Sequence, residues 1–147
     1  MSYTKKEFII SAFEEIGLAD YEYDLQPEEY QSALRKLDAM IASWNSLGVT
    51  LGYPLPAKPS DSNLNQDTTV PDSANEAIVT NLAMRLAPLF GKQVSTDTKV
   101  IAKSTFENLT RIASVPQEMD YNTTIAGAGY KGVTQNNNIF LGTKNTF

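Results

Sequence analysis

The sequence predicts an all-α fold, a small helical bundle of about four helices with a long extended C-terminal arm. Apolar residues recur at the helical period in four segments, residues 5–16, 27–47, 73–90 and 96–113. These segments cover nearly half of the chain, above the usual helical share of roughly a third, and no convincing strand competes with them. The helical period is absent after residue 114. We therefore divide the chain into a helical core, residues 1–114, and an arm, residues 115–147.

The first two predicted helices have clear signals at their ends. Thr4 and Glu7 have the spacing of a capping box, in which each side chain accepts a hydrogen bond from the backbone N–H of the other residue. Gly17 supplies a left-handed residue after the first helix. The second helix begins at Pro27, whose missing N–H costs nothing at the first helical position. It has the clearest apolar stripe in the chain, formed by Tyr30, Leu34, Leu37, Ile41 and Trp44.

Residues 49–71 are predicted to form a connector, because several prolines prevent a long helix there. An irregular loop of this length inside a small domain is more often functional than accidental. Tyrosines in loops are typical of contact surfaces, which makes Tyr53 a candidate interface residue.

The third and fourth helices are predicted from their caps and their apolar spacing. Ser73 and Glu76 have the spacing of a second capping box. The third helix then runs through Ile78, Leu82, Leu86 and Leu89. The fourth helix follows Ser95 and is expected to direct five residues inward, namely Ile101, Ala102, Phe106, Leu109 and Ile112.

Arg85 falls inside the apolar stripe of the third helix, and Asn81 lies one turn before it. A charged side chain in such a stripe must extend to solvent, form an ion pair, or lie at an interface. Two interpretations follow, an arginine at the edge of the core or an ion pair across helices or subunits. Asn81 and Arg85 are therefore candidates for a subunit interface, together with Tyr53.

The composition excludes several classes of catalytic site. The chain contains neither cysteine nor histidine, which removes thiolate nucleophiles, thiolate metal sites, and the commonest general base and metal ligand. Only carboxylate chemistry remains, for example at Glu14 and Glu15 or at Glu28 and Glu29. Adjacent residues on a helix do not face each other, so neither pair is a ready-made acid–base dyad. We predict no catalytic residues, no cofactor and no metal site.

Acidic residues gather around the first loop and the start of the second helix, and our candidates for an acidic or channel-facing surface are Glu22, Asp24, Glu28 and Glu29. The net charge of −5 argues against a protein that clamps nucleic acid through its phosphates. It is compatible with a wall past which DNA slides without adhering. No apolar run has the length of a membrane span, and the N-terminus does not resemble a signal peptide. We expect a protein that is made in a cytoplasm and does not enter a membrane.

The arm carries only four charged residues, Glu118, Asp120, Lys131 and Lys144. Solvated tails usually have high charge and low hydrophobicity, and this segment lacks the charge. Apolar residues recur along it, and the candidates for docking on a partner are Tyr121, Ile125, Tyr130, Val133, Ile139, Phe140, Leu141 and Phe147. A long neutral arm with spaced apolar residues suits docking on another subunit.

Several short blocks resemble a known phage family. The block ALRKLDAMIASW at residues 33–44, followed by Leu47-Gly48-Val49 and Gly52-Tyr53, resembles the second helix and following turn of the tail accessory factors of short-tailed phages. These proteins are also called packaged-DNA stabilisation proteins or head-to-tail adaptors. The block NLAMRLAP at residues 81–88 is similar to the third helix of that family, and the resemblance covers about residues 3–113.

The resemblance implies a structural protein of the phage virion that is assembled in the host cytoplasm and located in the neck or tail. It implies a homo-oligomeric ring, commonly twelve-fold, bound under the portal protein after DNA packaging. The arms would reach onto the portal, and the opposite face would receive the next tail component. Double-stranded DNA would pass through the channel without sequence-specific binding, as the acidic charge also suggests.

Two alternatives belong to other functional classes. One is a small cell-wall (peptidoglycan) hydrolase that uses carboxylates of the acidic loop, either alone or in addition to an adaptor role. The other is an acidic adaptor that binds an unrelated basic protein without forming rings.

Overall fold

The computed structural model describes residues 3–19 and 24–114. The chain divides into two units, Met1–Val115 and Pro116–Phe147, and only the first is described below. The predicted docking arm with its eight candidate residues lies outside the described residues, as does Glu22. The assignments made for them stay predictions.

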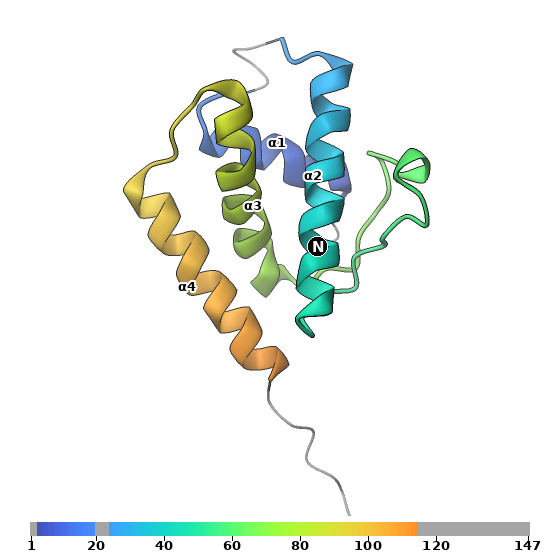
Figure 1. Cartoon of the computed structure of the whole chain (residues 1–147), viewed down its shortest axis with the longest axis vertical. Helices are drawn as coiled ribbons and strands as arrows, with labels where there is room; N and C mark the ends of the chain where they lie inside the picture. Colours follow the sequence, from blue (N-terminus) through green and yellow to red (C-terminus); the bar gives the residue numbers. More distant parts are fainter. Residues whose placement is uncertain (1–2, 20–23, 115–147) are drawn as a thin grey trace, which may run out of the picture. The chain divides into compact units, whose positions relative to one another are not determined.

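The described residues of the first unit form four α-helices, in the order α1 (Lys5–Glu15), α2 (Pro27–Ser46), α3 (Asp72–Leu86) and α4 (Thr96–Ala113). Two 3₁₀ turns accompany them, η1 (Pro59–Asp61) in the connector and η2 (Ala87–Phe90) after α3. Helix α1 packs against α2 and α3, while α4 packs along α3 (Figure 1). Since the described residues contain no named strand, the predicted all-α bundle is confirmed. None of the helices within them is long and apolar enough to cross a membrane.

The core lies where α1, α2 and α3 meet. Phe8 and Phe13 of α1 are fully buried, and the Phe13 ring makes edge-on contacts with Tyr30 of α2 and with Phe90 of η2. Trp44 at the end of α2 is also buried and packs on Phe106 of α4, with 5.0 Å between the ring centroids. Each large side chain buried in this way stabilises the fold by about 1.5–3 kcal/mol. Trp44 is therefore a core residue, as its position in the apolar stripe indicates.

The start of α1 confirms the predicted capping box. The Thr4 hydroxyl accepts from the Glu7 N–H at 3.2 Å, and the Glu7 carboxylate accepts from the Thr4 N–H at 2.6 Å. The Glu7 carboxylate also accepts from the Thr4 hydroxyl at 2.8 Å. The two bonds that the carboxylate accepts lower the pKa of Glu7, with the bond from the Thr4 backbone N–H as the largest cause. Gly17 follows the helix with a φ of 74°, which confirms the left-handed residue there.

Helix α3 differs from its prediction at both ends. It begins at Asp72 after Pro71 and has no side-chain cap, so the capping box predicted for Ser73 and Glu76 is wrong. The α-helix ends at Leu86 because Pro88 has no N–H to continue the hydrogen-bond ladder, and η2 follows. The side chains of η2 point in other directions than in an α-helix, because a 3₁₀ turn is wound more tightly. Leu89 of η2 is therefore 53% exposed.

Helix α4 buries fewer apolar side chains than the apolar spacing of its sequence predicts. Ala102 and Leu109 are buried and Phe106 is half-buried, but Ile101 and Ile112 are 37% and 67% exposed. The reason is that α4 packs mainly on one neighbour, α3, so only a narrow strip of its surface is covered.

Candidate functional site

A cluster of polar side chains around Asp38 attaches the connector to the helices. The Lys5 ammonium group lies 3.4 Å from Asp38 Oδ1, and the Tyr53 hydroxyl donates to the same oxygen at 2.6 Å. The Ser62 hydroxyl donates to Asp38 Oδ2 at 2.6 Å. The Lys5 ammonium also lies 4.6 Å from the centroid of the Tyr53 ring. One carboxylate of α2 thus joins α1 to two points of the connector.

Within the cluster, the opposite charges of Lys5 and Asp38 compensate each other, and both side chains are largely removed from water. The Lys5 side chain is fully buried and that of Asp38 is 12% exposed, and such groups are tolerated in an interior only when they are paired. Burial, together with the hydrogen bond to Asp38 and the negative charge of Asp38, raises the pKa of Tyr53 far above its ordinary value. Tyr53 therefore remains a neutral donor throughout the physiological range.

The connector backbone also caps α1. The first N–H groups of a helix have no partner within it. In α1, the N–H of Lys5 donates to Gln66 O at 3.1 Å and that of Lys6 donates to Leu64 O at 2.9 Å. The backbone N–H and the hydroxyl of Thr68 both donate to Tyr3 O. These bonds hold the connector to the start of α1 on the C-terminal side of η1, and the hydrogen bond from Tyr53 to Asp38 holds it on the N-terminal side.

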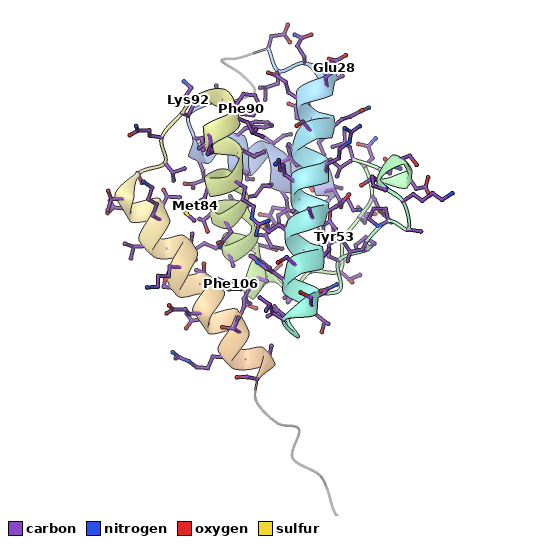
Figure 2. All side chains as sticks on the ribbon, viewed as in Figure 1. Glu28, Tyr53, Met84, Phe90, Lys92 and Phe106 are labelled. Carbon is purple, nitrogen blue, oxygen red and sulfur yellow. The ribbon has the colours of Figure 1, made fainter. Side chains whose placement is uncertain are left out.

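A groove with a volume of about 870 Å³ lies between α3 and α4. Its lining is largely apolar but includes three lysines, and consists of Asn81, Met84, Ala87, Pro88, Lys92, Gln93, Val94, Lys99, Ala102, Lys103 and Phe106. Figure 2 shows Met84 between the two helices and Lys92 near the upper end of the groove. The Asn81 amide bridges the helices by donating to Ala77 O at 2.8 Å and to Ala102 O at 3.0 Å.

The three interface candidates lie in two different places. Asn81 and Arg85 belong to α3, where Asn81 lines the groove and Arg85 is exposed. Tyr53 lies in the Asp38 cluster, where it is only 7% exposed. Figure 2 shows Tyr53 beside α2, across the bundle from α4. Their role at a subunit interface stays a prediction.

The acidic candidates lie at the start of α2. Asp24 and Glu28 are exposed, whereas Glu29 is half-buried and its carboxylate accepts from the Gln26 N–H at 2.8 Å. Glu29 therefore has a local structural role as a helix cap. Asp24 and Glu28 leave the negative charge at this end of α2 open to solvent.

The carboxylate pairs considered for catalysis are Glu14 with Glu15 and Glu28 with Glu29. One member of each pair has a structural contact, because Glu15 accepts from the Thr98 hydroxyl at 3.3 Å and Glu29 caps α2. Within residues 3–19 and 24–114, no group of three or more acidic side chains is placed to hold a metal ion.

The Asp38 cluster and the groove were not predicted from the sequence. A signal for the cluster exists, because Lys5 precedes Phe8 and Ile9 on the same face of α1, and Asp38 lies between Leu34 and Ile41 on α2. Both charges therefore face the core on a helical wheel. No comparable signal exists for the groove, which is lined by residues of α3, η2, the segment after η2, and α4.

A comparison with known families gives a match. A family model described as P22 tail accessory factor matches residues 1–145. This match extends beyond the short blocks that carry the resemblance and spans nearly the whole chain. The chain therefore belongs to the P22 tail accessory factor family, a family of structural proteins associated with the phage tail.

Proposed function

We propose that this protein is a head-to-tail adaptor of a short-tailed phage, which forms a ring under the portal, retains the packaged DNA and connects the head to the tail. The observation that carries the proposal is the family match over residues 1–145. A compact helical unit with a fixed connector is suited to such a role, because a ring requires rigid subunits. We expect a twelve-fold ring in the virion neck that forms in the host cytoplasm.

The acidic end of α2 is proposed to face the DNA channel. Asp24 and Glu28 are exposed there, and Glu22 and Glu29 lie beside them in the sequence. Negative side chains repel the phosphate backbone, so the genome passes without adhering to the wall. The proposal therefore includes no sequence-specific binding of DNA.

The arm, residues 115–147, is proposed to dock on the portal protein. Its charges balance, with two acidic and two basic residues, and its apolar residues are spaced along the whole segment. An arm adds buried area without requiring a larger core, and a ring of copies multiplies a modest contact into strong overall binding. The remaining face of the ring would receive the next tail component.

The arm hypothesis is tested with the purified portal ring of the same phage. Two variants are compared with the full chain, a truncation after Pro116 and a full-length variant with Ile139, Phe140 and Leu141 replaced by serine. Both should keep the helical circular dichroism signal of the full chain and lose portal binding in sedimentation. Equal portal binding by all three proteins would remove the docking role of the arm.

The ring hypothesis is tested by negative-stain imaging with and without portal, and Arg85→Ala is its most direct variant. The exposed Arg85 is expected to form an ion pair with a neighbouring copy, so its loss should weaken ring formation more than folding. Lys36→Ala, which removes an exposed cation from α2, is the matched control. Unchanged rings together with a lowered melting temperature would instead assign Arg85 to the edge of its own core.

A further inference from the structure

Two distinct surfaces lie at opposite edges of the helical unit. Helix α4 forms one edge and the connector with η1 forms the other, with α2 and α3 between them (Figure 1). The groove lies on the α4 side, because residues of α4 line it. A head-to-tail contact joins two different surfaces of neighbouring copies, and repeated contacts of this kind close into a ring when the rotation permits. Because the two surfaces lie at opposite edges, one copy can present each of them to a different neighbour.

The groove has an apolar lining with a basic rim. Met84 is 37% exposed, and the ring of Phe106 is half-buried at the lower end of the groove. Lys92, Lys99 and Lys103 line it, and no carboxylate belongs to the lining. Lys103 also lies 3.9 Å from the Glu107 carboxylate, one turn further along α4. The chain as a whole has a net charge of −5, so this concentration of cations is a local exception. The groove therefore fits a segment that presents an apolar side chain beside a negative charge.

The connector presents these two features on a fixed backbone. Leu55 is 37% exposed and Asp61 in η1 is exposed. Residues 54–67 contain Asp61 and Asp67 against the single cation Lys58, a net charge of −1. The hydrogen bonds from Tyr53 and Ser62 to Asp38 hold the segment on both sides of Leu55. Binding a loop that is already ordered costs less conformational entropy than binding a flexible one.

We infer that the connector of one copy docks in the α3–α4 groove of the next copy. Leu55 then packs against Met84 and Phe106, and the Asp61 carboxylate faces Lys99 in the groove lining. The inference rests on the proposed ring and specifies the surfaces that form it. It also accounts for two of the interface candidates lying in different places, since Asn81 lines the groove while Tyr53 anchors the connector.

Disulfide cross-linking tests this contact, because the chain contains no cysteine and introduced thiols can pair only with each other. Leu55→Cys and Met84→Cys are made separately and together, at two positions exposed enough to tolerate the change. After oxidation, a mixture of the two single variants should give a covalent dimer, whereas neither variant alone should. The double variant should give a ladder of oligomers. Leu47→Cys, at a more exposed position at the end of α2, replaces Leu55→Cys as the matched control.

A charge exchange provides a second, independent measurement. Lys99→Glu is expected to lower the cross-linking yield about two- to fivefold, the range for a partly exposed ion pair. Adding Asp61→Lys in the Leu55→Cys copy should restore the yield. If the yield is unaffected by Lys99→Glu, the charge complementarity is wrong.

The outcomes separate this inference from the proposed adaptor function. Cross-linking is carried out on free protein and on portal-bound protein. Rings on the portal without the Leu55–Met84 cross-link would overturn the contact and leave the adaptor function standing. A ladder in free protein that never binds portal would support the contact and oppose the adaptor function. Dimers from a single-cysteine variant alone, or equal yield with the Leu47→Cys control, would overturn the head-to-tail arrangement.

Discussion

The ammonium group of Lys5 lies 3.4 Å from the carboxylate of Asp38, and the Lys5 side chain is fully buried. The two residues belong to different helices, and the same carboxylate also accepts hydrogen bonds from Tyr53 and Ser62 of the connector. This pair therefore stabilises two features at once, the packing of α1 on α2 and the position of the connector.

Asp38→Asn should destabilise the helical unit by about 3 kcal/mol, because it leaves the buried Lys5 charge without a counter-ion. Urea unfolding followed by circular dichroism measures the change. Asp61→Asn, at an exposed carboxylate of the connector, is the control and should stay within about 0.5 kcal/mol of the unchanged protein. Adding Lys5→Met to Asp38→Asn should recover part of the loss. A double variant that is less stable than Asp38→Asn alone would contradict the role of the unpaired charge.

Stability should fall as the pH rises above about 10, partly through Tyr53. Burial and Asp38 raise the pKa of Tyr53 in the folded state, so above the ordinary tyrosine pKa the unfolded chain loses this proton while the folded chain retains it. The folded state then binds more protons, and its stability declines with pH. Unfolding free energies measured between pH 8 and 11 should decline less steeply for Tyr53→Phe. Identical slopes for the two proteins would rule out this contribution.

Gly52→Ala should destabilise the connector more than Gly91→Ala does. Both glycines have positive φ, 68° and 64°, so both substitutions introduce the same backbone strain. A Cβ at Gly52 would also lie 2.6 Å from Thr69 Oγ1 and 3.0 Å from Thr69 O, whereas a Cβ at Gly91 meets nothing within 4 Å. We expect about 1 kcal/mol for Gly91→Ala and at least 1 kcal/mol more for Gly52→Ala. Equal melting temperatures for the two variants would show that Thr69 moves aside without cost.

Asn81→Ala should loosen α4 from α3. The Asn81 amide donates to Ala102 O in α4, and its loss should cost about 1 kcal/mol. Since α4 packs mainly on α3, faster hydrogen exchange should be confined to α4 amides, while those in α1 and α2 stay protected. Ser104→Ala is the control, because the Ser104 hydroxyl donates only within α4. Faster exchange throughout the bundle would instead indicate a global loss of stability.

The sequence by itself determined the features that depend on neighbouring residues. The capping box of Thr4 and Glu7, the start of α2 at Pro27 and the left-handed Gly17 all lie as predicted, because caps and turns involve residues within a few positions. The apolar stripe of α2 likewise identified Leu37, Ile41 and Trp44 as core residues. Local spacing was also sufficient for the fold class.

Only the tertiary structure decided which distant groups meet. A helical wheel indicates that Lys5 and Asp38 face inward, but not that they face each other or that Tyr53 and Ser62 join them. The change from α3 to a 3₁₀ turn at Pro88 left Leu89 exposed, against the prediction of one continuous helix, and the packing of α4 beside α3 left the groove between them. These features depend on the path of the chain between helices. That path is set by the packing of the whole unit, because long-range contacts are not encoded in the spacing of neighbouring residues.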